Sequence, residues 1–253
     1  MSTRRIRVDS ALVQRGLAES ADVARALIDE GVVLANGSVV MTHSRQVAQS
    51  DELLVKPVDQ FVSRGGIKLE AALAAFNIDV SNQRALDAGA STGGFTDCLL
   101  QRGASEVVAV DVGKSQMHER VATNNRVVVI DTFNVRQLAD DTQDLPIPLR
   151  SEFDLVVADL SFISLKSVSR ALTARLSGSG NLVVLVKPQF EATKLEVDKS
   201  QGVIADQAIR DRVVGEVNES FAEQGWVVRG CIESPIHGAE GNVEYLVWYR
   251  FEA

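Results

Sequence analysis

The pattern of apolar and polar residues changes near residue 60. Before it, apolar residues at helical spacing over residues 9–17 and 20–31 predict two short helices, and Ser20 is placed to cap the second. Two β-rich runs then flank Asn36-Gly37, a strong hairpin signal, and the run DELLVK adds one more strand. The first part of the chain therefore predicts a small α+β module.

From residue 66 onward, short apolar runs alternate with helical patterns. The strand-like runs are RALDAG, EVVAVDV, RVVVID, FDLVVADL and NLVVLVKP. This alternation predicts an α/β fold of Rossmann-like type, with a mostly parallel, doubly wound sheet. The last two strand-like runs, GWVVRGCIESP and NVEYLVWYRF, lie close together in sequence and predict an antiparallel C-terminal edge. We therefore expect a module over residues 1–58, a linker over 59–65 and a large domain over 66–253.

Composition narrows the classes of function. The chain has 253 residues, 45% of them hydrophobic, and a formal net charge of −8, which argues against a nucleic-acid surface over the whole chain. The start of the chain is polar and no apolar run approaches the roughly 18 residues of a membrane span, so we expect a cytoplasmic protein without one. Cys98 and Cys231 lie far apart beside only three histidines, so the sequence predicts reduced thiols and no metal site.

The segment LDAGASTGGF, residues 86–95, follows the first strand of the large domain, where a doubly wound sheet binds its ligand. Its glycines do not match the G-x-G-x-x-G pattern of nicotinamide-binding folds, and no Gly-Lys-Ser/Thr ending follows as in a P-loop. Small residues here indicate that the backbone passes close to a ligand. The predicted ligand-binding residues of this segment are Asp87, Gly89, Ala90, Ser91, Thr92, Gly93, Gly94 and Phe95.

Acidic residues end three strands in a row, and this indicates which ligand binds. Asp87 would repel a pyrophosphate but suits an ammonium or sulfonium group. Asp111 ends the next strand, where a carboxylate can accept both ribose hydroxyls, and Asp131 ends the third, near an adenine edge. Together they predict S-adenosylmethionine as the cofactor.

Two more charged residues end the following strands. Asp159 follows the fourth strand and Lys187 the fifth, so both side chains should face the methyl group of the cofactor. A lysine in this position suits a hydroxyl acceptor, because it can stabilise a developing alkoxide or, when neutral, remove the proton. Lys68 and Glu244 are further candidates that spacing alone does not place in the site.

Several of these motifs resemble those of a known family. VSRGGIKL, LDAGASTGGFTDCLL, VVADLSFISL, VKPQFE and GNVEYL resemble the TlyA family of bacterial ribosomal RNA 2′-O-methyltransferases, also called hemolysin A. The resemblance implies a class I methyltransferase domain related to the FtsJ rRNA methyltransferase. It implies a catalytic Lys-Asp-Lys-Glu tetrad, which falls on Lys68, Asp159, Lys187 and Glu244. It further implies a cytidine 2′-hydroxyl in ribosomal RNA as the acceptor, and ribosomal RNA or ribosomal subunits as partners.

The N-terminal part resembles the RNA-binding module named after ribosomal protein S-four, with departures. Ala21 follows Ser20 where that module usually has arginine, and residues 1–60 hold seven basic and eight acidic residues but no aromatic one. We therefore do not expect bases to stack on this module. We expect it to contact the phosphates of folded RNA instead. The predicted RNA-binding residues are Arg4, Arg5, Arg7 and Arg15.

Other functions remain open at this level. The name hemolysin suggests a membrane-active protein as one alternative. A non-catalytic RNA-binding assembly factor or a small-molecule O-methyltransferase would also fit parts of the pattern. Residues 187–204 are charged and lack periodicity, so we expect a long loop that closes over the site when RNA docks.

Overall fold

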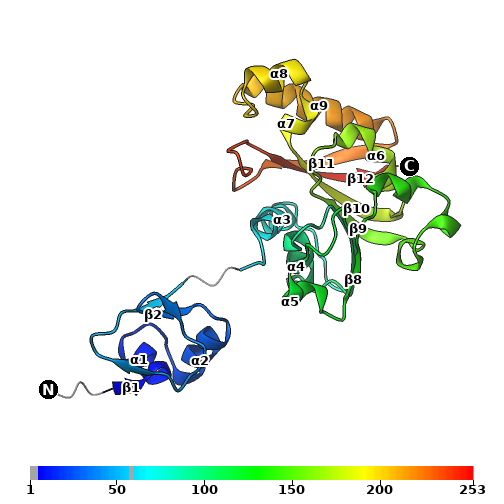
Figure 1. Ribbon diagram of the computed structural model, residues 1–253. Helices are drawn as coiled ribbons and strands as arrows, with labels where there is room; N and C mark the ends of the chain where they lie inside the picture. Colours follow the sequence, from blue (N-terminus) through cyan, green and yellow to red (C-terminus); the bar gives the residue numbers. More distant parts are fainter. Residues whose placement is uncertain (1–4, 57–59, 253) are drawn as a thin grey trace. The chain divides into compact units, whose positions relative to one another are not determined.

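The computed structural model describes residues 5–56 and 60–252. Its chain contacts divide the protein into two units, residues 1–59 and 60–253 (Figure 1). The division falls close to the change of pattern in the sequence.

The first unit packs two helices against short strands. The helices are α1 (Val8–Gln14) and α2 (Ala21–Asp29), and the strands are β1 (Arg5–Arg7), β2 (Val33–Ala35), β3 (Ser38–Val39), β4 (Gln46–Ala48) and β5 (Leu53–Val55). Strand β2 lies between β3 and β5, and β1 pairs with β4, all antiparallel.

Local signals in this unit act as the sequence predicts. The Ser20 side chain accepts a hydrogen bond from the Val23 amide (3.2 Å) and so caps α2. Asn36 and Gly37 have φ of +51° and +76°, which the tight turn between β2 and β3 requires. The pairing of β1 with β4 was not predicted, because three-residue strands are too short to show a period.

The second unit is an α/β fold around a mostly parallel sheet in the order β11-β12-β10-β9-β6-β7-β8. The strands are β6 (Arg84–Ala88), β7 (Glu106–Val110), β8 (Val127–Ile130), β9 (Phe153–Ala158), β10 (Leu176–Val186), β11 (Trp226–Glu233) and β12 (Tyr245–Phe251). Strands β6 to β10 run parallel to one another, while β12 runs antiparallel between β10 and β11. The predicted antiparallel C-terminal edge is confirmed.

Helices cover both faces of this sheet (Figure 1). The α-helices are α3 (Arg64–Ala75), α4 (Gly94–Gln101), α5 (Glu119–Ala122), α6 (Ser169–Thr173), α7 (Pro188–Glu191), α8 (Lys194–Lys199) and α9 (Gln207–Ala222). The 3₁₀ turns are η1 (Val135–Ala139), η2 (Thr142–Asp144), η3 (Ile147–Leu149) and η4 (Leu165–Ser167). Leu69 of α3 and Leu99 of α4 pack in one apolar cluster, and Leu172 of α6 and Phe221 of α9 pack in the other.

The second unit begins earlier than the sequence pattern indicates. Phe61 is buried, the Val62 amide donates a hydrogen bond to Asp97 Oδ2 (2.8 Å), and α3 begins at Arg64. Residues 60–65 therefore pack into this unit, although the sequence assigns them to a linker. A single buried aromatic residue before a helix gives no periodic signal.

The segment after β10 is also more ordered than the sequence predicts. It contains α7, which opens with Pro188, and α8, which opens with a capping box between Thr193 and Glu196. Helices of four and six residues are too short to show amphipathic periodicity, which is why the sequence predicts an irregular loop here.

Candidate active site

The carboxyl ends of the parallel strands bring the predicted site residues to one edge of the sheet. Strand β6 pairs with β7 on one side and with β9 on the other, so the chain order reverses beside it. Ligands of doubly wound sheets bind at such a switch point. The residues that follow β6, β7, β9 and β10 therefore share one place in the fold.

The loop after β6, residues 89–93, which we call the glycine loop, has unusual backbone angles. Gly89, Ser91 and Gly93 have φ of +85°, +45° and +90°. A Cβ atom at Gly89 would lie 2.6 Å from the backbone oxygen of Asp159, so no side chain fits there. Glycine at this position lets the loop pass directly beside the residue that ends β9.

Two adjoining pockets open along this loop. The larger has a volume of about 480 Å³ and the smaller about 160 Å³, and Gly89, Ser91, Asp159 and Ser161 line both. Lys187 lines the smaller one. The predicted cofactor residues that line either pocket are Gly89, Ala90, Ser91, Thr92, Gly94, Phe95 and Asp111.

Asp111 sits in the larger pocket with its carboxylate held by the backbone. Its Oδ2 accepts a hydrogen bond from the Ser91 amide (2.8 Å) and its Oδ1 from the Gly113 amide (2.6 Å). Each carboxylate oxygen has a second acceptor position, so Asp111 can still receive a hydroxyl from a ligand. The Asp111 carboxylate thus connects the loop after β7 to the glycine loop.

Three predicted cofactor residues, Asp87, Gly93 and Asp131, do not line either pocket. Asp87 is fully buried, accepts a hydrogen bond from Thr96 Oγ1 (2.6 Å), and burial raises its pKa to about 7. Gly93 faces Met117 and Val121 of the next segment, and Asp131 accepts a hydrogen bond from the Ser115 amide (2.8 Å). These residues shape the loops that form the pocket.

Other lining residues were missed from the sequence. Most of them follow the strand-end acids by one to five positions: Val112, Gln116, Phe133, Asn134, Val135, Arg136, Leu160, Ser161, Phe162 and Ile163. Phe162 stands out because its side chain is 91% exposed and its φ is +63°. Taking each strand-end acid with the residues that follow it would have found this set.

The residues of the predicted tetrad form two lysine–carboxylate pairs. Lys187 Nζ lies 2.6 Å from Asp159 Oδ1 and donates to Ser161 Oγ (3.0 Å). Lys68 Nζ, on α3, lies 2.5 Å from Glu244 Oε2, and this pair is buried. Gln189 Nε2 contacts Glu244 Oε1 (3.4 Å) from a position two residues after Lys187, so the pairs are neighbours.

The predicted RNA-binding arginines differ in their surroundings. Arg4 lies outside the described residues, and Arg5 is exposed on β1. Arg7 pairs with Asp9 (2.6 Å), and this hydrogen bond lowers the pKa of Asp9 to about 2. Arg15 donates to the backbone oxygens of Asp51 (2.6 Å) and Ala48 (2.9 Å). The contacts of Arg15 favour a structural role in the first unit.

Comparison with known proteins gives a consistent picture. The model of the FtsJ-like methyltransferase family matches residues 61–251. The 16S/23S rRNA (cytidine-2′-O)-methyltransferase TlyA of Mycobacterium tuberculosis is 45% identical over 249 residues, covering 98% of this chain and 90% of the relative. Hemolysin A of Brachyspira hyodysenteriae is 36% identical, covering 96% of this chain and 99% of the relative.

A solved structure agrees with these relatives. A protein from Streptococcus thermophilus described as a hemolysin is 34% identical, with a TM-score of 0.72, covering 100% of this chain and 90% of that one. Within residues 5–56 and 60–252, no helix is long and apolar enough to cross a membrane. The chain therefore belongs to the TlyA, or hemolysin A, family of rRNA methyltransferases, and its second unit is an FtsJ-like methyltransferase domain.

Proposed function

We propose that this chain transfers a methyl group from S-adenosylmethionine to the ribose 2′-hydroxyl of a cytidine in ribosomal RNA. The observation that carries the proposal is the Lys187–Asp159 pair, which lines the pocket beside the glycine loop at the switch point of the sheet. The name of the Mycobacterium tuberculosis relative, a 16S/23S rRNA (cytidine-2′-O)-methyltransferase, supports the choice of acceptor. A ribosomal substrate implies that the protein acts in the cytoplasm.

The residues of the larger pocket fit S-adenosylmethionine. Asp111 offers a carboxylate for ribose hydroxyls, and Val110 and Phe133 offer apolar surface for a purine ring. The exclusion of any Cβ at Gly89 keeps the loop close to the residues that end β9. When bound, the cofactor supplies an electrophilic methyl group on a positively charged sulfur.

Lys187 has the chemistry that a hydroxyl acceptor needs. A ribose hydroxyl is a very weak acid, and it must lose its proton as the new carbon–oxygen bond forms. Neutral Lys187 can accept that proton, and the ammonium so formed stabilises the negative charge that develops on the oxygen. Lys187 Nζ lies 2.6 Å from Asp159 Oδ1 and donates a hydrogen bond to Ser161 Oγ (3.0 Å), so the amino group is oriented before RNA binds. The buried Lys68–Glu244 pair supports the same region from α3.

The surface beside the pocket suits a nucleotide. Phe162 presents an exposed ring at the pocket that Arg136 also lines. An aromatic face stacks on a nucleobase that has left its helix, and a guanidinium contacts phosphate. The acceptor ribose would then lie between this surface and Lys187.

Methyl transfer to isolated ribosomal subunits tests the proposal. The purified protein is incubated with S-adenosylmethionine labelled in its methyl group and with small or large subunits from cells lacking the gene. We expect label in RNA at a cytidine ribose, mapped by arrest of reverse transcription at low nucleotide concentration. An oligonucleotide carrying 2′-deoxycytidine at the mapped position should accept none. Label on a base would contradict the proposal, and RNA binding without transfer would favour a non-catalytic assembly factor.

A further inference from the structure

The segments that leave the neighbouring parallel strands β9 and β10 are joined by a ladder of three contacts. The first is the pair of Lys187 with Asp159 and Ser161. The second is the contact between the rings of Phe190 and Phe162, whose centroids lie 5.2 Å apart. Both connect the residues placed at the methyl-transfer site to the loop after β9.

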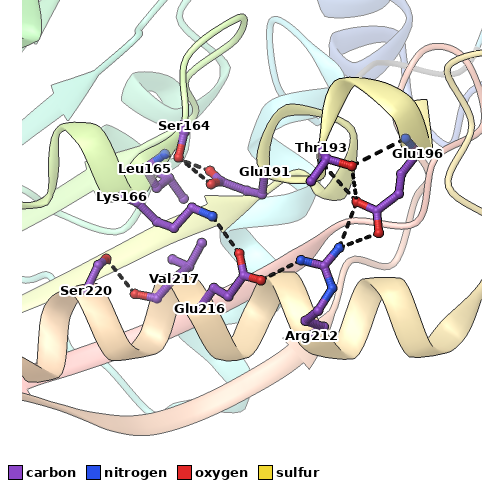
Figure 2. A network of polar contacts seen from close by, with 10 residues as sticks. All are labelled: Ser164, Leu165, Lys166, Glu191, Thr193, Glu196, Arg212, Glu216, Val217 and Ser220. Carbon is purple, nitrogen blue, oxygen red and sulfur yellow. Dashed lines mark hydrogen bonds and ion pairs between the residues drawn. The ribbon is translucent and has the colours of Figure 1, made fainter. Parts of the chain in front are cut away.

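The third contact is made by Glu191, as Figure 2 shows. Its Oε2 accepts a hydrogen bond from Ser164 Oγ (2.5 Å), and its Oε1 accepts one from the Leu165 amide (2.6 Å). Glu191 lies one helical turn after Lys187, and Ser164 lies five residues after Asp159. The segments after β9 and β10 therefore contact each other directly after the strands and again four to five residues further on.

The buried position of Glu191 has a cost in desolvation. The residue is only 7% exposed, and burial raises the pKa of its carboxyl. A buried carboxylate contributes little net stability, because desolvation offsets its hydrogen bonds. What it does supply is a fixed geometry, since both of its oxygens must meet donors on the other segment.

We propose that Glu191 is a positioning residue for methyl transfer, which fixes the loop carrying Asp159 and Phe162 against the turn that follows Lys187. It does not touch the reacting atoms. It sets the distance and orientation of the Lys187–Asp159 pair by holding the far end of the ladder. This inference rests on the function proposed above for that pair.

The outer part of the same network provides a matched control. Lys166 pairs with Glu216 (2.6 Å), Glu216 with Arg212 (2.5 Å), and Arg212 with Glu196 (2.6 Å) (Figure 2). These side chains are between a quarter and two fifths exposed, and ion pairs with such access to water contribute little. Glu196→Ala therefore removes a carboxylate from the same network without touching the loop after β9.

The experiment compares Glu191→Ala with Glu196→Ala in methylation of ribosomal subunits. Alanine removes both acceptor oxygens, so the Leu165 amide and Ser164 Oγ lose their partner. Glutamine would be a milder change, because its oxygen can accept from the Leu165 amide while its N–H donates to the Ser164 hydroxyl. For Glu191→Ala we expect kcat to fall about 10- to 100-fold, the effect of displacing catalytic groups by a fraction of an ångström to one ångström. The KM for RNA and the affinity for S-adenosylhomocysteine should change less than about twofold. Glu196→Ala should match wild type in all three.

Two further variants separate positioning from general damage. Ser164→Ala removes one bond of the ladder from the opposite side, and we expect a smaller fall in kcat, about three- to tenfold. In single-turnover assays, adding Glu191→Ala to Lys187→Ala should cost no further activity, because the pair that Glu191 positions is already gone. Circular dichroism confirms that each variant is folded.

The outcomes distinguish this inference from the proposed function. An inactive wild type would remove the proposed function. Wild-type kcat in Glu191→Ala, or an equal additional loss in the Lys187→Ala background, would overturn the inference and leave the function standing.

Discussion

At the scale of single residues, the two lysines of the site differ in what they can reach. Lys187 lines the smaller pocket, whereas Lys68 is enclosed with Glu244 between α3 and the start of β12. Under the proposed function, we therefore expect the chemistry on an acceptor hydroxyl at Lys187, with Lys68 and Glu244 supporting the wall behind it. Removing one member of such a buried pair leaves an uncompensated charge, so those positions affect folding as well as activity.

Substitution of Lys187 tests this division. Lys187→Ala should lower the single-turnover rate of methylation by roughly 10²- to 10⁴-fold, the range for loss of one positioned acid–base group. Lys187→Arg should fail almost as badly, because a guanidinium has a different shape and does not release its proton. Affinity for S-adenosylhomocysteine, measured by calorimetry, should change little. Near-wild-type rates in Lys187→Ala would place the chemistry elsewhere.

Asp87 gives a prediction about pH. Burial raises its pKa to about 7 from an ordinary value of 3.8, so between these values the folded protein holds a proton that the unfolded chain has released. The contribution of Asp87 to stability therefore falls as pH rises through this interval. Asp87→Asn does not ionise but can still accept the Thr96 hydrogen bond.

The stability of Asp87→Asn relative to wild type should rise with pH. Between about pH 5 and pH 8, the difference in free energy of unfolding should grow by up to about 3 kcal/mol, since each pKa unit corresponds to about 1.4 kcal/mol. Urea denaturation without cofactor measures it. Exposed Asp140→Asn is the control, and a pH-independent difference for Asp87→Asn would contradict the prediction.

At the scale of elements, two glycines with nearly the same φ angle allow the cost of backbone strain to be separated from the cost of crowding by neighbouring atoms. Gly89 and Gly103 have φ of +85° and +89°, but a Cβ at Gly103 would meet its nearest neighbour at an ordinary 3.6 Å. Gly103→Ala should cost only backbone strain, about 1–2 kcal/mol. Gly89→Ala should cost more and should weaken S-adenosylhomocysteine binding at least about tenfold, because the loop must move away from Asp159. Thermal unfolding and calorimetry measure both, and equal effects would show that crowding at Gly89 is unimportant.

Elements also explain how far the sequence predicts this site. Asp111, Asp159 and Lys187 follow parallel strands directly, so strand pattern alone brings them to one edge. Lys68 and Glu244 are 176 residues apart, and no local pattern pairs them; their place in the site followed from family resemblance.

Short elements set the other limit. β1, β4, α7 and α8 are too short for a period, and their existence depends on contacts made elsewhere in the fold. The contact of Glu191 with Ser164 is of this kind, since it joins the short helix α7 to the loop after β9, and no sequence pattern relates the two.

At the scale of the whole molecule, binding and chemistry are assigned to different units. The residues proposed for methyl transfer all belong to the second unit, and the predicted RNA-binding arginines belong to the first. A chain with a net charge of −8 must bind RNA through local basic groups. Among the predicted arginines that the structure describes, Arg5 and Arg7 are exposed on β1, with Arg7 paired to Asp9, whereas the guanidinium of Arg15 is held by backbone oxygens.

This difference makes Arg15 a matched control for the other two. Replacing Arg5 and Arg7 with alanine should weaken rRNA binding and lower the slope of log affinity against log salt by up to about 2, since each phosphate contact releases about one counterion. Arg15→Ala should lower the thermal stability of the protein, because three backbone oxygens lose their donor, and should leave the salt slope unchanged. Filter binding over a range of salt concentrations, with calorimetry for the cofactor, separates the two effects. If the double variant keeps the wild-type slope, phosphate contact by β1 is wrong, and RNA must be held by basic groups of the methyltransferase domain instead.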